Sequence, residues 1–314
     1  MKTAHMLADK VRILNFDGSL LRQTRLIERY RPEIVDLAAL GPSCRLWANQ
    51  KTADTIKLAL KPKAKHCVTF LGSGDFHHIS QLLAGQFTEP LTLIVFDFHP
   101  DWDILPPRLG CGSWVSRALE QKNISKALLL GISSDDISSP AIHTGNLKAL
   151  KDNRLEIYPC AHKPTRVLFR NVPGNKSIQI RRSGLARDIV WTELQGRNME
   201  IFMAQVLQGC RSRKAYISID KDCLRSEHAL SNWEEGRFSL DELLRLLKVI
   251  KETMDIVGLD ITGEYSEPEV SGSIKSFCSR LDHPAEYTAR GKPSASIDTI
   301  NEETNLQILG LLGR

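Results

Sequence analysis

The sequence lacks the features typical of secreted, membrane-spanning and disulfide-stabilised proteins. Its seven cysteines are odd in number and form no C-x-x-C pair, which indicates free thiols in a reducing compartment. The first residues have no apolar signal-peptide core, and no stretch approaches the ~20 apolar residues that a membrane span requires. We therefore expect a soluble cytoplasmic protein with no membrane partner.

The chain also has no large excess of charge of either sign. The 42 Lys and Arg and 37 Asp and Glu residues give a net charge of +5, spread along the chain. The basic cluster at 61–65 has no aromatic or Gly-rich RNA-binding signature beside it, so we expect solvated surface there and no nucleic-acid partner. The 314 residues contain no internal repeat and no linker, and 42% of them are hydrophobic. A single domain over 1–314 with a substantial core is predicted.

What the chain does contain is an alternation of apolar, β-branched runs with amphipathic segments. This pattern predicts an α/β fold, a three-layer, doubly wound, mostly parallel sheet with helices on both faces. Residues 266–296 are rich in Ser, Pro and Gly and are expected to form a long loop. Strands are expected at 11–16, 66–71, 91–96, 127–132, 155–158, 177–182, 188–191, 215–219 and 256–261, and helices at 31–40, 47–60, 79–83, 114–121, 199–207, 240–254 and 301–312.

The most informative stretch follows the strand expected at 91–96. Asp97, His99 and Asp101 occupy alternate positions, so in an extended chain all three project to one side. Burying three ionisable groups behind an apolar strand costs several kcal/mol of folding free energy unless a cation neutralises them. A D-x-H-x-D pattern alone is also typical of loop caps. A second cluster of the same kind is what favours a metal site.

That second cluster is Asp220 and Asp222, after the strand expected at 215–219. In doubly wound sheets ligands gather at the carboxyl ends of the strands, so both clusters should meet there. With His77 they supply four carboxylates and two imidazoles, enough to hold two divalent ions about 3.5 Å apart. Oxygen and imidazole ligands without thiolate favour Mn²⁺, with Fe²⁺, Zn²⁺ or Co²⁺ as alternatives. The predicted ligands are His77, Asp97, His99, Asp101, Asp220 and Asp222.

Four motifs occur in order along residues 72–268. They are Gly-x-Gly-Asp75-x-His77, Asp97-x-His99-x-Asp101, Ser218-Ile-Asp220-x-Asp222 and Gly258-Leu-Asp260-Ile-x-x-Glu264. Their order and spacing resemble those of the ureohydrolases, the family of arginase, agmatinase and formiminoglutamase. The resemblance implies the arginase/deacetylase α/β fold and a binuclear manganese centre. It also implies hydrolysis of a linear C–N bond, in a guanidino or amide group of a small substrate, by metal-bound hydroxide.

By position, the resemblance also implies contacts with the substrate. Glu264 would hold a guanidinium-like end, and Glu267 is a weaker substitute for it. Asp103 and Asp136 fall where the family contacts the rest of its substrate. An extra residue between Asp260 and Glu264 leaves a second interpretation open, in which Glu264 is a surface residue.

Two other departures from the family pattern leave alternatives open. Phe76 interrupts the first motif, so the ligand could be His77 or His78, and we favour His77 because the residues after it then follow the family's order. Cys111 stands where the family has its proton-shuttle histidine. Cysteine is a poor shuttle unless its pKa is lowered, and its alternative role is that of a small buried residue. His228 could supply the missing imidazole or be an exposed loop residue.

Three functions are compatible with these residues. The leading one is a metal-dependent hydrolase of non-peptide C–N bonds, acting on a small polar or cationic substrate. A second is a deacetylase-like amidohydrolase in which Tyr265 polarises the amide. A third, motivated by Cys111, is a metal-binding protein without catalysis. Related folds often form trimers or hexamers, so a homo-oligomer is compatible with the sequence, which does not determine it.

Overall fold

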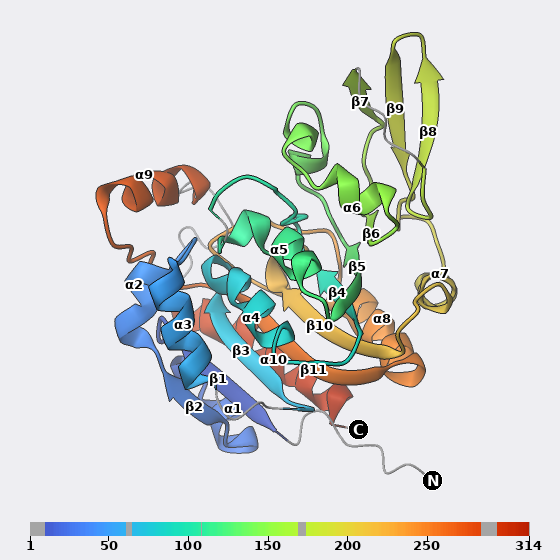
Figure 1. Ribbon diagram of the computed structural model, residues 1–314. Helices are drawn as coiled ribbons and strands as arrows, with labels where there is room; N and C mark the ends of the chain where they lie inside the picture. The colour runs from blue at the N-terminus through green and yellow to red at the C-terminus, as the bar shows by residue number, and fades with distance from the viewer. Residues whose placement is uncertain (1–9, 61–64, 108, 169–173, 284–293, 314) are drawn as a thin grey trace.

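The computed structural model describes residues 10–60, 65–107, 109–168, 174–283 and 294–313. Its centre is an eight-stranded sheet in the order β2-β1-β3-β11-β10-β4-β5-β6, and every pair of neighbouring strands is parallel (Figure 1). This confirms the expected mostly parallel α/β sheet. The strands are β1 (Val11–Asn15), β2 (Glu33–Asp36), β3 (Val68–Ser73), β4 (Leu91–Phe96), β5 (Ile124–Leu130), β6 (Leu155–Tyr158), β10 (Lys214–Asp220) and β11 (Asp255–Glu264).

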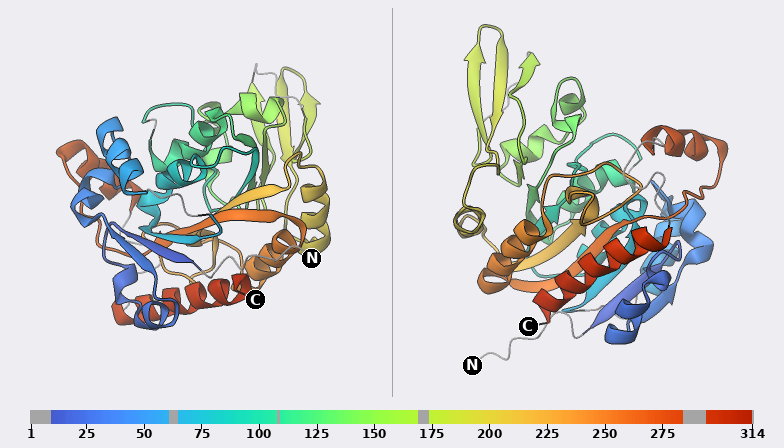
Figure 2. Two further views of the ribbon diagram at one scale, coloured as in Figure 1. Left: turned by 60° about the horizontal axis from the view of Figure 1, so that its bottom comes forward. Right: turned by 180° about the vertical axis from the view of Figure 1, so that it is seen from behind.

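Helices cover both faces of this sheet, which gives the predicted three layers (Figures 1 and 2). Each face has its own hydrophobic core. Parallel sheets are stable in this arrangement because both faces of their strands are buried. One face carries α1 (Thr24–Tyr30), α7 (Met199–Gln208), α8 (Leu240–Thr253) and α10 (Ser294–Leu312), and the other carries α3 (Gln50–Ala59), α4 (Ser80–Ala84), α5 (Trp114–Glu120) and α6 (Leu147–Lys151).

Strand β4 shows how the sequence produces the two cores. Side chains alternate between the faces of a strand. Ile94 and Phe96 accordingly join the core on the side of α8, whereas Leu93 and Val95 join the core on the side of α4 and α5. All six residues of β4 are buried. The strand that carries the D-x-H-x-D motif is therefore held from both sides.

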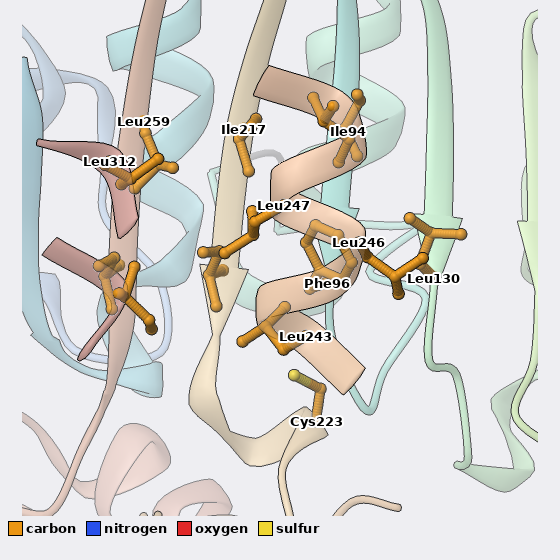
Figure 3. Close-up of a cluster of buried hydrophobic side chains, with 14 of the residues drawn as sticks. Ile94, Phe96, Leu130, Ile217, Cys223, Leu243, Leu246, Leu247, Leu259 and Leu312 are labelled. Atoms are coloured by element: carbon orange, nitrogen blue, oxygen red, sulfur yellow. The ribbon is translucent and has the colours of Figure 1, made fainter. Parts of the chain in front are cut away.

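Helix α8 begins with a capping box and covers the strands that lead to the candidate ligands. Ser239 Oγ accepts the backbone N–H of Glu242, and the carboxylate of Glu242 accepts the backbone N–H of Ser239. Leu243, Leu246 and Leu247 follow at helical spacing and lie over β4 and β10 (Figure 3). Burial of each leucine contributes about 1.5–3 kcal/mol, which holds the helix against both strands.

The largest error of the sequence analysis lies near the N-terminus. The pattern predicts a helix at 31–40, but the structure has α1, then β2, then α2 (Gly41–Cys44). Arg31 ends α1 with a φ of 44°, and Pro32 disfavours helical backbone at the residue before it. Strand β2 pairs with β1, and its Glu33 forms an ion pair with Arg12 at 2.8 Å.

Two regions contain more structure than the sequence predicts. Strands β7 (Thr165–Leu168), β8 (Ile178–Ser183) and β9 (Ala186–Trp191) form an antiparallel sheet that projects beside β6 (Figure 1), and β7 is not among the expected strands. Within the expected loop at 266–296, helix α9 (Ser273–Asp282) forms and α10 already begins at Ser294. Residues 284–293 of that loop, like 61–64 of the basic cluster, lie outside the described residues.

Two simple predictions can be compared with the structure directly. Each of the seven cysteines is free, as the odd number without C-x-x-C pairs indicates. In the described ranges, no helix has both the length and the apolar character needed to cross a membrane.

Candidate metal centre

The six predicted ligands meet in one cavity of about 370 Å³ at the carboxyl ends of β3, β4 and β10. In the sheet, Ile219 of β10 pairs with Phe96 of β4. The next residue of each strand is an aspartate, so Asp220 and Asp97 leave the sheet side by side. Two segments more than a hundred residues apart thus deliver their carboxylates to the same place.

His77 lies among three of these carboxylates, in the short helical segment Gly74–Ile79 that follows β3. Its Nδ1 is 3.1 Å from Oδ2 of Asp97, 3.3 Å from Oδ2 of Asp101 and 3.5 Å from Oδ2 of Asp220. All four side chains are buried. One imidazole nitrogen and three carboxylates therefore converge on one point.

The other ring nitrogen of His77 is fixed by the sheet below it. Nε2 lies 2.9 Å from Oγ of Ser218. Ser218 donates its hydroxyl proton to Asp260 at 2.6 Å, and Ser80 and Tyr216 donate to the same carboxylate at 2.8 and 2.6 Å. With that proton used, Ser218 accepts from Nε2–H. We therefore assign the lone pair of His77 to Nδ1, the nitrogen that faces the carboxylates.

His99 faces the same cluster from the other side. Its Nδ1 is 3.1 Å from Oδ2 of Asp222 and 3.8 Å from Oδ1 of Asp97. Its Nε2 is 3.2 Å from Oε2 of Glu234. Asp97 therefore lies between His77 and His99 and is the carboxylate that two neighbouring ions would share.

The donor set fits divalent cations. Oδ2 of Asp97 is buried and has no hydrogen-bond partner in the described part of the chain. Burial raises the pKa of Asp97 and of Asp220, and the charge of Asp222 raises both further, so these carboxylates oppose their own ionisation unless a cation lies between them. Two groups of nearby ligand atoms share Asp97, one formed by His77, Asp97 and Asp101 and the other by Asp97, His99 and Asp222.

Asp101 is held in an uncommon backbone conformation. Its φ is 46°, in the left-handed backbone region that residues other than glycine rarely adopt. Nε1–H of Trp114 donates to Oδ2 of Asp101 at 2.7 Å and helps to hold it there. Strained residues of this kind persist where the surrounding structure holds them, and they cluster at functional sites.

Cys111, Asp103 and Asp136 also line the cavity, and the resemblance implies a substrate contact for the two aspartates. Burial, together with the charges of Asp101 and Asp75, raises the pKa of the Cys111 thiol well above its ordinary value. The thiol is therefore protonated at neutral pH and is unsuited to accept a proton as a general base. Asp103 accepts a hydrogen bond from the hydroxyl of Thr144 at 2.8 Å.

Glu264 does not face the cavity, which corrects the role that the resemblance implies for it. Its carboxylate is buried against Lys221, Gln23 and Asn305. Gly263, with a φ of 89°, stands on the side of the centre instead, and a Cβ there would lie 2.5 Å from Oδ1 of Asp220. The extra residue in the motif thus turns Glu264 away from the ligands, because successive strand residues point to opposite faces.

Three other candidates lie outside the cavity lining. Nε2 of His228 is 3.2 Å from Oε1 of its neighbour Glu227, so His228 does not supply the missing imidazole. The hydroxyl of Tyr265 is 3.5 Å from Oε1 of Glu267. Glu267 lines a different cavity, beside Arg45, and is no substitute for Glu264 at the centre.

The structure separates the two adjacent histidines. His77 lies among the carboxylates, whereas Nε2 of His78 lies 3.5 Å from Sγ of Cys44, and the His78 ring is fully buried. Burial lowers the pKa of His78 to about 3. The geometry thus agrees with the order of residues that favours His77 as the ligand.

The sequence analysis missed several residues that shape the cavity. Trp233 and Asp282 line it, and Asp75 contacts both Trp233 and His283, the residue that follows Asp282. Oδ1 of Asp75 accepts from Nε1 of Trp233 at 3.1 Å and lies 2.7 Å from Nε2 of His283, while Oδ2 accepts from Arg45. Asp75 belongs to a quoted motif and Trp233 follows the second D-x-D, but nothing in the sequence marks Asp282.

The cavity is strongly acidic. Seven aspartates line it, at positions 97, 101, 103, 136, 220, 222 and 282, and none of its described lining residues is Lys or Arg. Those at 97, 101, 220 and 222 are buried at its floor, whereas Asp136 and Asp282 are exposed. A cavity with walls of one charge focuses the field and attracts counter-ions, so this one favours cations.

Comparison of the sequence with known proteins gives a partial match. No protein-family model matches the chain. An uncharacterized protein of Thermotoga maritima is 28% identical over 197 residues, a match that covers 63% of this chain and only 58% of that relative. The match therefore spans less than two thirds of the relative's length.

Several solved structures share the architecture. Proclavaminate amidino hydrolase from Streptomyces clavuligerus has a TM-score of 0.53 at 12% identity, over 97% of this chain and 92% of that one. Helicobacter pylori arginase has a TM-score of 0.53 at 12% identity, over 97% and 99% of the two chains. Agmatine ureohydrolase of Thermoplasma volcanium has a TM-score of 0.50 at 11% identity, over 96% and 93%.

The chain therefore has the arginase-like α/β fold. The resemblance to the ureohydrolases that the motifs predict is confirmed at the level of the fold.

Proposed function

We propose that the chain is a divergent ureohydrolase-like enzyme, a hydrolase that depends on two divalent metal ions and cleaves a linear C–N bond of a small polar or cationic substrate. The observation that supports it most directly is the position of Asp97 between His77 and His99, with one buried carboxylate oxygen left without a hydrogen-bond partner. The fold it shares with enzymes named arginase and ureohydrolase supports it independently.

Two sets of side chains would hold the ions. When bound, the ions, for which Mn²⁺ is the first choice, would supply an activated water and polarise the atom under attack. One ion would be held by His77, Asp97, Asp101 and Asp220, and the other by Asp97, His99 and Asp222.

The remaining residues of the cavity would bind the substrate and disfavour anions. Asp103 and Asp136 can accept hydrogen bonds from polar or cationic groups of a substrate, while the excess of aspartates disfavours anions. Trp102 and Trp233 provide apolar wall, and a cavity of about 370 Å³ suits a small molecule.

A specific observation favours an amide over a guanidino substrate. The carboxylate that would hold a guanidinium, Glu264, is occupied by Lys221 within the protein. A linear amide needs no such carboxylate. The phenol of Tyr265 lies outside the cavity lining and is therefore not placed to polarise an amide bound there.

The test combines metal content with turnover. We expect elemental analysis of protein loaded with Mn²⁺ to give two ions per chain. Arginine, agmatine, guanidinobutyrate, formiminoglutamate and a set of N-acetylated amines would then be screened for release of urea, ammonia, formamide or acetate. Turnover should disappear in Asp97→Ala and Asp220→Ala and persist in His228→Ala. A wild-type protein that binds no metal would refute the proposal. One that binds two ions and turns over nothing would favour metal binding without catalysis.

A further inference from the structure

The two imidazoles of the centre are supported in different ways. Nε2 of His77 contacts the hydroxyl of Ser218, which belongs to β10 and leads to Asp260 in β11, so its support comes from the buried sheet. Nε2 of His99 instead lies 3.2 Å from Oε2 of Glu234, in the loop between β10 and α8. That loop also carries Trp233, a wall of the cavity.

We propose that Glu234 is a positioning residue that sets the affinity of the second metal position, the one held by His99 and Asp222. This inference rests on the proposed function, since it assumes that two ions bind. With Glu234 in this role, the two metal positions differ in what supports their histidine ligands. His77 depends on the core of the sheet, and His99 depends on a loop of the cavity wall.

The position of Glu234 suits this role. Oε2 of Glu234 is buried, and the polar group beside it is Nε2 of His99, 3.2 Å away. A carboxylate at that place selects the tautomer with the proton on Nε2, so that the lone pair of Nδ1 faces Asp222 and Asp97. It also raises the basicity of the ligand nitrogen, which strengthens coordination.

Other contacts of the His99 ring do not fix its tautomer. Phe98 and Trp233 lie edge-on to it, with ring centroids 4.9 and 5.4 Å away, and they restrict its tilt but offer Nε2 no acceptor. Glu234 itself is absent from the described lining of the cavity, so it stands behind His99 rather than beside a substrate. Its effect on the centre therefore passes through His99.

The chain offers a matched control in the adjacent residue. Glu235 accepts hydrogen bonds from the backbone and the hydroxyl of Ser226, at 3.0 and 2.9 Å, and is not among the lining residues of the cavity. Glu234→Ala removes the partner of Nε2, Glu234→Gln keeps an acceptor oxygen without the charge, and Glu235→Ala changes the same loop without touching His99.

The experiment is a titration with Mn²⁺ that is monitored by calorimetry and by electron paramagnetic resonance. Circular dichroism checks that each variant is folded. We expect wild type and Glu235→Ala to bind two ions and give the spectrum of a coupled pair. Loss of a metal ligand's hydrogen-bonding partner typically costs 10–100-fold in metal affinity, so Glu234→Ala should weaken one of the two binding steps by about that factor. At one equivalent of Mn²⁺ it should show an uncoupled, mononuclear spectrum. Glu234→Gln should restore part of the loss.

Each other outcome overturns the inference. If a folded Glu234→Ala protein binds both ions with wild-type affinity, or weakens both equally, Glu234 does not set the second position while the proposed function stands. Should Glu234→Ala fail to fold, Glu234→Gln with wild-type affinity for both ions would exclude a role for the charge. A wild-type protein that binds no pair of ions would remove the proposed function together with this inference.

Discussion

Nζ of Lys221 lies 2.5 Å from Oε1 of Glu264, and both side chains are buried. Lys221 stands between the candidate ligands Asp220 and Asp222, so this ion pair ties the ligand-bearing loop to the end of β11. Asn305 of α10 donates to the same carboxylate at 2.7 Å. The residue that the motif resemblance assigns to the substrate is therefore part of the internal support of the centre.

Glu264→Gln is predicted to destabilise the protein strongly, because it leaves the ammonium of Lys221 buried without a counter-charge. Breaking a buried ion pair in this way costs about 3–5 kcal/mol. The double variant Lys221→Met/Glu264→Gln removes both charges and should be less destabilised than Glu264→Gln alone. Urea unfolding measures both. If Glu264 instead contacted the substrate, its replacement would raise KM and leave the unfolding free energy unchanged.

Ser218→Ala is predicted to weaken the metal position of His77. The variant removes the acceptor of Nε2–H, which orients the ring, and a loss of about 10–100-fold in affinity for one Mn²⁺ is expected. Ser80→Ala is the control, because the Ser80 hydroxyl also donates to Asp260, whereas Nε2 of His77 lies against the hydroxyl of Ser218. Calorimetric titration with Mn²⁺ should separate the two variants, and equal losses in both would contradict the assignment.

Cys111→Ser is predicted to leave kcat/KM nearly unchanged. The raised pKa of the thiol keeps it protonated, so it does not act as a base at neutral pH. Removal of a true general acid or base costs about 10²–10⁴-fold. The measurement is kcat/KM on whichever substrate the screen identifies. A loss in that range would identify Cys111 as the proton donor.

Stability should fall as the pH drops below the ordinary pKa of histidine, owing to His78. Burial holds its pKa at about 3 in the folded protein, against about 6.5 in the unfolded chain. Between these values the unfolded chain binds a proton that the native state does not, so each pH unit removes up to about 1.4 kcal/mol. Urea unfolding at pH 7, 6 and 5 should therefore show a smaller loss in His78→Gln than in wild type. Parallel losses in the two proteins would exclude His78 as the cause.

Much of the fold follows from local patterns in the sequence. The runs at 91–96 and 215–219 are uncharged and mostly apolar, which is typical of a strand buried on both faces. The helix at 240–253 follows from leucines at helical spacing behind a capping box. The region at 31–40 is misread because an edge strand beside Pro32 has too few apolar residues to show its periodicity.

The candidate ligands could be located from the sequence for the same reason. Asp97, His99 and Asp101 follow one parallel strand, and Asp220 and Asp222 follow its neighbour. Parallel strands end at a common edge, so strand position alone brings these residues together. Convergence of this kind depends on topology, which the alternation of strands and helices already implies.

The sequence by itself thus determined the parallel sheet and the approach of imidazole and carboxylate groups at its carboxyl edge. Only the tertiary structure decided which way the neighbouring residues turn. A single added residue, with Gly263 at a positive φ, sends Glu264 to Lys221, and a loop conformation places Glu234 behind His99. These outcomes depend on backbone rotation and on partners distant in the chain, which local periodicity does not encode.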